Sequence, residues 1–316
     1  MMMIVGIGNP LLDTVVEVSE EFMRDSNLSK GGMTLVSEEV VKSLLSSLGE
    51  ERSVSPGGSA ANAVAVAARS GASAAFIGMV GDDDLGRLYE TLTIEDGVES
   101  FLARGSYHQG VCLVLVTPDG ERTFATHLGA AQCLRKEDVD LEVLERAQVL
   151  HVEGYLLDNE LLTDTLLHVV GEAKRQGVLV SLDAGDPGVI ERHRPVVEKL
   201  VREYADVVFF NEDEAEAYTG LSPMEAAVKL HKEVSTAVVK LGSEGSVIVD
   251  SDGVHKVPSV EVGVVNTNGA GDAYAGAFLA SLIRGYGVSE AGRKASVVAA
   301  KVVSQAGARL LEDFSG

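Results

Sequence analysis

An aspartate that follows a glycine-rich turn near the end of the chain has the residue types that phosphoryl transfer requires. The segment Val264–Leu279 begins with apolar residues, turns through small and polar ones, and continues as a small-residue run that predicts a helix. Gly269, Ala270 and Gly271 would leave the first N–H groups of that helix open to an anion, where its dipole is positive. Asp272 would then accept the proton of an attacking hydroxyl. A capped helix after a tight turn fits the same residues, and the segment alone leaves both interpretations open.

The composition indicates one large folded domain without affinity for polyanions. The 316 residues are 46% hydrophobic, which supplies a core and argues against disorder. A formal net charge of −22 argues against nucleic acid or an anionic membrane as a partner. Met1–Leu12 is apolar but lacks a basic start, and it predicts a buried first strand rather than a signal peptide. Cys112 and Cys133 are typical of reduced thiols that pack in a cytoplasmic protein.

Apolar runs of strand length alternate with helical stretches along most of the chain. The predicted strands are Ile4–Gly8, Ala75–Met79, Val149–Val152, Leu179–Asp183, Val207–Phe210, Ala237–Lys240 and Ser246–Val249, and the helices between them include Asn62–Ser70, Asp158–Gln176 and Pro223–Glu233. This alternation predicts an α/β fold with a parallel sheet covered by helices on both sides. Ligands of such folds bind at the carboxyl ends of the strands.

Two segments, Asp13–Val36 and Val98–Leu128, break this alternation and predict antiparallel β-structure. In the second, Cys112–Val116 and Arg122–Thr126 flank a turn that contains Pro and Gly, which is typical of a hairpin. We expect the two segments to pair into a lid over the active site; a solvent-exposed edge sheet is the alternative.

Four motifs, taken in order, resemble the ribokinase-like (PfkB) family of carbohydrate and nucleoside kinases, and most of all its adenosine-kinase-like branch. They are Gly6–Asp13, Pro56–Asn62, Asn211–Glu214 and Gly269–Asp272, and the similarity covers almost the whole chain. The resemblance implies a single domain over residues 1–316. Its core would be a three-layer α/β/α arrangement with a mostly parallel sheet, and residues of about 13–36 and 98–128 would form a small β-sheet lid.

The first two motifs predict the binding site for the hydroxyl-bearing acceptor. Asn9 and Asp13 follow the first predicted strand, and an amide and a carboxylate there can pair with vicinal sugar hydroxyls. The resemblance implies that Gly57, Gly58 and Asn62 also hold the sugar. The small residues that start the next helix would equally signal tight packing of that helix on the sheet.

A nucleoside acceptor also requires an apolar slot for its base. Leu11, Leu35 and Tyr155 are the candidates, although core packing accounts equally well for the two leucines. The resemblance favours adenosine as the acceptor. The alternatives are a sugar such as ribose, fructose or a ketodeoxy-sugar, or a catalytically silent nucleoside-binding regulatory protein.

The remaining motif residues predict the nucleotide side of the site. The resemblance implies that Asn211 and Glu214 act on Mg²⁺ through water, whereas the residues alone favour a capped acidic helix start. Lys240, Gly242 and Gly245 resemble the loop that lines ATP; a plain hairpin turn is the alternative.

Arg122 resembles an arginine of the branch that reaches the transferred phosphate, although a solvated surface role fits it as well. The implied cofactors are ATP and Mg²⁺. Relatives hold a monovalent cation with an Asp where this chain has Asn266, so activation by K⁺ is in doubt. A monomer and a homodimer remain equally open, since the lid could pair edge to edge with another lid.

Overall fold

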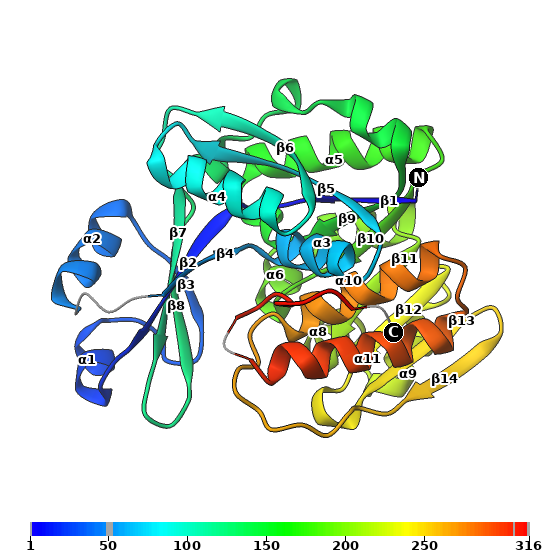
Figure 1. Ribbon diagram of the computed structural model, residues 1–316. Coiled ribbons are helices and arrows are strands. Elements are labelled where there is room, and N and C mark those ends of the chain that lie inside the picture. The colour runs from blue at the N-terminus through cyan, green and yellow to red at the C-terminus, as the bar shows by residue number, and fades with distance from the viewer. Residues whose placement is uncertain (1, 49–52, 306, 315–316) are drawn as a thin grey trace.

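The computed structural model describes residues 2–48, 53–305 and 307–314, which form two sheets of nine and five strands (Figure 1). The large sheet has, in spatial order, β14 (Gly253–Val257), β13 (Ser246–Asp250), β12 (Thr236–Lys240), β11 (Val207–Asn211), β10 (Leu179–Asp183), β9 (Ala147–Glu153), β1 (Met3–Ile7), β5 (Ser73–Gly81) and β6 (Val98–Gly105). Neighbouring strands are parallel, except that β13 is antiparallel to both of its neighbours. The predicted α/β architecture is confirmed, and all seven predicted strands are present.

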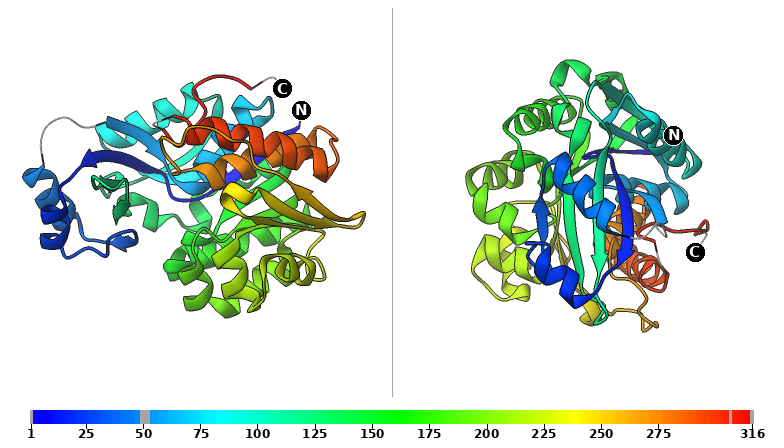
Figure 2. Two further views of the ribbon diagram at one scale, coloured as in Figure 1. Left: turned by 90° about the horizontal axis from the view of Figure 1, so that it is seen from below. Right: turned by 90° about the vertical axis from the view of Figure 1, so that its left-hand side faces the viewer.

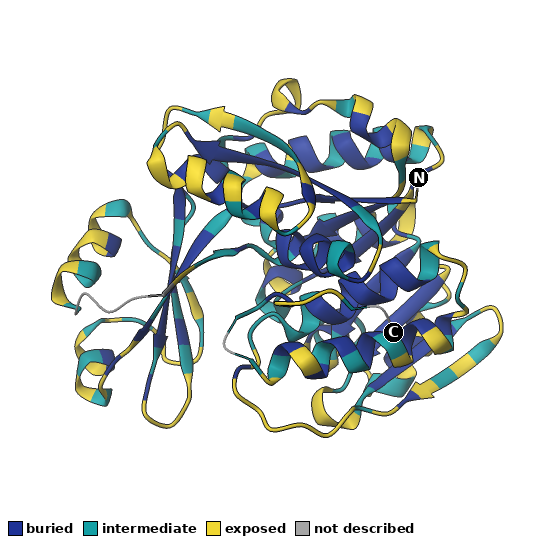
Figure 3. Ribbon diagram, in the orientation of Figure 1, coloured by how far each residue is buried: buried dark blue, intermediate teal, exposed yellow. Residues whose placement is uncertain are grey.

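Helices cover both faces of the large sheet because its strands bury alternate side chains on opposite sides. In β1, Met3, Val5 and Ile7 belong to one core and Ile4 to the other. The first core lies under α5 (Glu160–Arg175), α6 (Pro187–Arg192), α7 (Arg194–Lys199), the π-helical turn Leu200–Tyr204, α8 (Glu212–Thr219) and α9 (Pro223–Leu230). The second lies under α3 (Ser59–Arg69), α4 (Asp84–Glu95), α10 (Ala270–Ile283) and α11 (Val288–Val303). The strands are buried along most of their length, and exposed residues gather on the outer faces of the helices (Figure 3).

The small sheet stands off one end of the large sheet and forms the lid (Figure 2). Its spatial order is β3 (Met33–Leu35), β8 (Arg122–His127), β7 (Gly110–Val116), β2 (Leu11–Glu17) and β4 (Ser53–Gly57). Helices α1 (Glu20–Asp25) and α2 (Glu38–Ser47) pack on its outer face, where Met23 and Val41 contact Leu113 and Leu115. The outer face of the lid is therefore an apolar core of its own.

The lid differs from the predicted one in its composition. The hairpin of β7 and β8 is confirmed, but β2 pairs with β7, and β3 with β8, in parallel. Val98–Gly105 is the outermost strand of the large sheet, because α4 makes the crossover that carries the chain from β5 to a parallel neighbour. Strand β4 completes the lid, although no sequence signal predicted it.

Short 3-10 turns connect several elements. They are Gly129–Cys133, Lys136–Asp138, Leu141–Arg146, Gly154–Asp158 and Gly242–Glu244. The last joins the antiparallel strands β12 and β13, so this loop is a hairpin connection, one of the two alternatives left open for it. Within the described ranges, we find no helix of the length and apolarity that a membrane span requires.

Candidate active site

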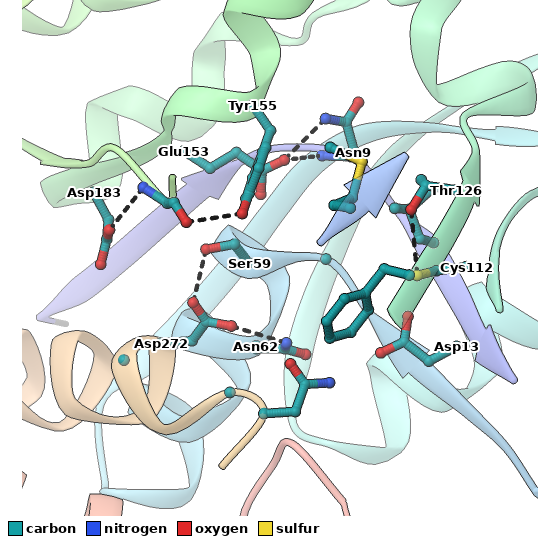
Figure 4. Close-up of a pocket in the computed structure, with 18 of the residues that line it drawn as sticks. Asn9, Asp13, Ser59, Asn62, Cys112, Thr126, Glu153, Tyr155, Asp183 and Asp272 are labelled. Atoms are coloured by element: carbon teal, nitrogen blue, oxygen red, sulfur yellow. Dashed lines mark hydrogen bonds between the residues drawn. The ribbon is translucent and has the colours of Figure 1, made fainter. Parts of the chain in front are cut away.

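A cavity of about 300 Å³ lies between the carboxyl ends of the parallel strands and the inner face of the lid (Figure 4). It brings together most of the residues that the sequence singled out: Asn9, Leu11, Asp13, Leu35, Gly58, Asn62, Tyr155, Asn211, Glu214, Lys240, Gly269, Gly271 and Asp272. Gly57, Arg122, Gly242, Gly245 and Ala270 are not among its lining residues. The small sheet therefore covers the site, as the lid interpretation requires.

Asp272 lies in the first turn of α10 and is held by two side chains of α3. Ser59 Oγ donates to its Oδ1 at 2.7 Å, and Asn62 Nδ2 donates to its Oδ2 at 3.0 Å. Ser59 and Asn62 share a face of α3 because they are three residues apart. Burial raises the pKa of Asp272 to about 6, with Asp183 adding to the rise and the Asn62 hydrogen bond opposing it. The carboxylate is thus oriented, and it is ionised at neutral pH.

The turn before α10 supplies backbone donors, but not quite the ones that the sequence suggested. Gly269 caps the helix at φ 75°, where a Cβ would meet Ala308 at 2.6 Å, so the position requires glycine. The amide of Asn268 donates to Asn266 Oδ1 at 2.8 Å, and that of Ala270 donates to the carbonyl of Thr267 at 3.3 Å. Neither amide is available to a ligand.

Free amides remain at Gly269, Gly271 and Asp272. In the part of the chain that the structure describes, none of the three donates to a protein acceptor. The first amides of a helix have no intrahelical partner, and they carry the positive end of its dipole. This corner can therefore bind an anion such as a transferring phosphoryl group.

Lys240 places a cation beside these amides. It ends β12 and forms an ion pair with Asp183 of β10, with Nζ to Oδ2 at 2.6 Å. A Cβ on Gly271 would lie 3.1 Å from the same Nζ, so glycine lets the ammonium approach the helix start. Burial opposes the charge, but Asp183 and Glu214 outweigh it and raise the pKa of Lys240.

Asn211 and Glu214 form a capping box at the start of α8 and also line the cavity. Asn211 Oδ1 accepts from the Glu214 amide at 2.8 Å, while the Glu214 carboxylate accepts from the amide of Asn211 at 2.9 Å and from its Nδ2 at 2.7 Å. Burial and the charge of Asp183 raise the pKa of Glu214 to about 8. The capped helix start is thus observed, and both carboxylate oxygens are already engaged in it.

This donor set fits Mg²⁺ held by phosphates and water rather than by a protein cage. Among the described residues, no three acidic, histidine or cysteine side chains converge as metal ligands. Mg²⁺ in phosphotransferases keeps several waters and takes one or two carboxylates. Asp183 and Glu214 face the cavity in positions where they could hold such waters.

The opposite end of the cavity has hydrogen-bond acceptors without protein partners. Glu153 is 1% exposed and accepts from the amide of Asn9 at 2.9 Å, from Asn9 Nδ2 at 3.0 Å and from the amide of Ala60 at 2.7 Å. Asn9 Oδ1 is buried with no hydrogen-bond partner in the described chain. The Asp13 carboxylate, on a residue that is 9% exposed, accepts no hydrogen bond from the described residues. Burial raises the pKa of Asp13 to about 7, while the charge of Arg309 opposes the rise and that of Asp272 adds to it. Hydroxyl groups would satisfy both acceptors.

Gly57 and Gly58 let this corner close tightly. A Cβ on Gly57 would lie 2.3 Å from Asp13 Oδ1, and one on Gly58 would lie 2.2 Å from the carbonyl oxygen of Asn9. Gly58 also has φ 96°, which other residues rarely adopt. Gly57 therefore acts behind the cavity wall, whereas Gly58 is part of it.

The inner face of the lid forms an apolar wall beside this corner. Its lining side chains are Leu11, Met33, Leu35, Phe124 and Leu128. Leu35 is 47% exposed, so core packing does not explain it. Tyr155 also lines the cavity but is not part of this wall. Its hydroxyl donates to the carbonyl of Gly185 at 2.8 Å, on the side of Asp183 and Asp186.

Arg122 lies on the cavity face of the lid but beyond the cavity. Residues 122, 124 and 126 of β8 share one face, and Phe124 and Thr126 line the cavity. Arg122 Nη1 is buried without a hydrogen-bond partner in the described chain, so this nitrogen of the guanidinium is unsatisfied.

A second cavity flanks the β12–β13 hairpin. Leu241, Glu244 and Ser246 line it from the hairpin, and Glu212, Pro223 and Lys256 line it from neighbouring elements. The predicted glycines Gly242 and Gly245 do not line it themselves; at φ 52° and 96° they shape the hairpin around it.

Several residues of the site were not predicted. Ser59, Glu153 and Asp183 have the roles described above, and Cys112, which had been assigned to packing, lines the cavity and accepts from Thr126 Oγ1 at 3.3 Å. Glu153 and Asp183 each end an apolar strand with a carboxylate, and that signal was available in the sequence. Cys112 and Thr126 face each other across β7 and β8, which only the strand register reveals.

An acceptor corner, an oriented carboxylate and an anion-binding helix start together define a phosphotransferase that acts on a hydroxyl group. Residues 33–313 match the model of the pfkB family of carbohydrate kinases, and the chain belongs to that family. The predicted ribokinase-like fold and kinase class are thereby confirmed.

Relatives within the family differ in their acceptors. An adenosine kinase of Schizophyllum commune is 28% identical over 308 residues, which cover 88% of each chain. Fructokinase-1 of Oryza sativa is 31% identical over 242 residues, which cover 72% of this chain and 74% of the fructokinase. The crystal structure of adenosine kinase from Sinorhizobium meliloti aligns with a TM-score of 0.92 at 31% identity, covering 99% of this chain and 97% of that one.

Proposed function

We propose that this protein is an ATP-dependent kinase that phosphorylates the primary hydroxyl of adenosine or a closely related purine nucleoside. The observation that carries the proposal is the two-part cavity. An apolar wall of Leu35, Phe124 and Leu128 lies beside the unpartnered acceptors of Asn9 and Asp13. A nucleoside fills both parts, with its ribose hydroxyls on the acceptors and its base on the wall. A simple sugar would leave the wall exposed to water.

The relatives support both this acceptor and one alternative. Adenosine kinases are among the relatives in sequence and in structure. A fructokinase is 31% identical over 72% of the chain, which keeps a sugar acceptor as the second candidate. Residues of the acceptor corner suit either molecule, so the lid wall is the feature that separates them.

In the proposed reaction, a primary hydroxyl of the acceptor attacks the γ-phosphorus of ATP while Asp272 takes its proton. The new P–O bond forms as the bond to the β-phosphate oxygen breaks and ADP leaves. Ser59 and Asn62 hold the Asp272 carboxylate in place. Amides of Gly269 and Gly271, together with Lys240, stabilise charge on the transferring group.

The nucleotide is proposed to bind along β12 and its hairpin. Its base would enter the second cavity, beside Leu241 and Lys256, with its phosphates directed towards Lys240. Asn211, Glu214 and Asp183 would hold the waters of a Mg²⁺ ion, which would neutralise part of the charge of the phosphates. The lid sheet would exclude bulk water from the reacting groups. Arg122 would reach the phosphates only on further closure of the lid, since it lies outside the cavity.

A panel assay of ADP release tests the acceptor. Adenosine, inosine, ribose, fructose and a ketodeoxy-sugar are compared by kcat/KM for the wild type and for Phe124→Ala. We expect adenosine to be at least about 10-fold better than fructose, since an apolar contact of this size contributes roughly 1–3 kcal/mol. Phe124→Ala should reduce this advantage and leave the values for the sugars nearly unchanged. A preference for fructose, or an equal loss on every acceptor, would refute the nucleoside assignment.

A further inference from the structure

The C-terminal segment, which follows α11, packs directly against the active site. Backbone amides of Val265 and Asn266 donate to the carbonyl of Val303 at 2.9 and 3.0 Å, which joins the catalytic turn to the end of α11. Ala308 lies so close to Gly269 that a Cβ on the glycine would meet it at 2.6 Å. The amide of Phe314 donates to the carbonyl of Arg69 at 2.7 Å. In Figure 1 this red segment runs back past α10 and α3.

Arg309 extends from this segment into the acceptor corner and is 7% exposed. Its Nε donates to Asn62 Oδ1 at 2.9 Å, and one terminal nitrogen donates to the carbonyl of Gly57 at 3.3 Å. The other terminal nitrogen forms an ion pair with Asp96 Oδ2 at 2.9 Å. The guanidinium thus joins α3, the end of β4 and the residue that caps α4.

The contact with Asn62 determines which way its amide group points. Asn62 holds the base through Nδ2, and the carboxamide can present Nδ2 to Asp272 only while Oδ1 points the other way. On that other side, Arg309 Nε donates to Oδ1. A reversed carboxamide would present its NH₂ group there, and that group cannot accept a hydrogen bond. A reversal of Asn62 would set its oxygen against the Asp272 carboxylate and leave Arg309 without an acceptor.

The contact with Gly57 extends the effect to the acceptor carboxylate. Asp13 packs on Gly57 so closely that a Cβ there would meet Oδ1 at 2.3 Å. Tyr89 also donates to the Gly57 carbonyl, at 2.9 Å, so this peptide is held from two sides. The positive charge of Arg309 opposes the rise in the pKa of Asp13 that burial causes.

We propose that Arg309 is a positioning residue for phosphoryl transfer, which orients Asn62 towards the base Asp272 and sets a positive charge behind Asp13. The inference rests on the proposed function. It adds that the C-terminal segment is part of the catalytic apparatus. A role limited to anchoring that segment through Asp96 is the competing account.

The test compares Arg309→Met and Arg309→Lys with the matched control Arg69→Met. Arg69 binds the same Asp96 at 3.3 Å and Asp313 of the same segment at 3.4 Å. None of its hydrogen bonds reaches Asn62 or Gly57. Its loss therefore loosens the anchor alone. Values of kcat and of KM for acceptor and ATP are measured from pH 5 to 9 with the best acceptor of the panel.

We expect Arg309→Met to lower kcat, and with it kcat/KM, by about 10- to 100-fold, the scale of a lost hydrogen bond to a charged group. The acid limb of kcat/KM, which reports groups of the free enzyme, should move to higher pH, since Asp13 loses a neighbouring cation. The titratable groups that act on or with Asp13 there are Asp272, Cys112 and Tyr89. Arg309→Lys should restore the acid limb of kcat/KM, because it keeps the positive charge near Asp13. It should not restore kcat, because an ammonium lacks the planar fork that reaches three acceptors. Arg69→Met should change neither.

An equal loss of kcat/KM in Arg69→Met would overturn the proposal, and so would a folded Arg309→Met with wild-type kcat and acid limb. A second measurement requires no substrate. Loss of Arg309 should lower the melting temperature more at pH 8 than at pH 5.5, and this difference should vanish in an Asp13→Asn background. Absence of that coupling would remove the electrostatic role. If no acceptor is phosphorylated by the wild type, the proposed function fails, while the thermal comparison still decides the role of Arg309.

Discussion

Substitution of Asp13 by asparagine should stabilise the free protein while it impairs acceptor binding. Burial raises the pKa of Asp13 from 3.8 to about 7. The folded state therefore binds its proton more tightly than the unfolded chain does. For such a carboxyl group, stability is fully present below about pH 4 and is lost as the pH rises through 7. Asparagine mimics the protonated carboxyl group and escapes this loss.

The magnitude follows from about 1.4 kcal/mol for each pKa unit. Relative to a pH at which Asp13 is protonated in both states, its raised pKa destabilises the fold by about 4 kcal/mol at pH 8, where the folded protein is ionised. At pH 5.5, where only the unfolded chain is ionised at this group, the cost is about 2 kcal/mol. The advantage of Asp13→Asn should therefore grow by about 2 kcal/mol between the two values. For a chain of this size that corresponds to roughly 3 °C in melting temperature.

Thermal melts of the wild type and of Asp13→Asn at pH 5.5 and pH 8 measure this difference. Asp119→Asn is the matched control, because hydrogen bonds from Lys30 and Thr117 lower the pKa of Asp119 and reverse the expected sign. In kinase assays, Asp13→Asn should raise KM for the acceptor by about 10- to 100-fold, since a charged acceptor of hydroxyl groups is lost. An Asp13→Asn variant that is no more stable at pH 8 than the wild type would refute the reasoning.

Four further outcomes test the site. Asp272→Asn should lower kcat by at least about 100-fold with ATP binding retained, and unchanged turnover would exclude Asp272 as the base. In the wild type, kcat should decrease as the pH falls below about 6, the pKa to which burial raises Asp272. Lys240→Met should raise KM for ATP by about 10-fold or more, as loss of a charge-assisted phosphate contact implies, and an unaltered KM would place the phosphates elsewhere. Gly58→Ala should destabilise the fold by about 1–3 kcal/mol in chemical denaturation because of its positive φ, and a neutral effect would show that the acceptor corner is not tightly closed. Titration with K⁺ should leave activity nearly constant, because Asn266 lacks the charge of an aspartate and its Oδ1 already accepts from Asn268, whereas strong activation would show that an amide suffices.

The local sequence predicted the sheet strands well because their apolar runs are long and end in turn residues. Leu179–Asp183 coincides with β10, and Val207–Phe210 lies within β11. The glycines of the signature turns and Asp272 were also apparent, since residue type and the freedom that glycine gives the backbone are local properties. From these residues the sequence predicted an anion-binding helix start before any contact was known.

Other features depend on contacts between distant segments, which no local pattern encodes. Strand β4 belongs to the lid because it pairs with the edge of β2. Val98–Gly105 belongs to the large sheet because α4 returns the chain to pair with β5. The amides of Asn268 and Ala270 looked available in the sequence but are bound by their own turn.

The sequence alone determined the α/β class, because apolar runs of strand length alternate with helical stretches. It also predicted the two ends of the site and Asp272 as the base, from residue types at short spacing. Only the tertiary structure decided which side chains hold the Asp272 carboxylate and which carboxylates are buried. Ser59 and Asn62 meet Asp272 from more than 200 residues away, and Arg309 meets Asn62 from 247. These contacts form because α3, α10 and the C-terminal segment pack together. The resulting distances and burial determine the pKa values of the carboxylates in the site.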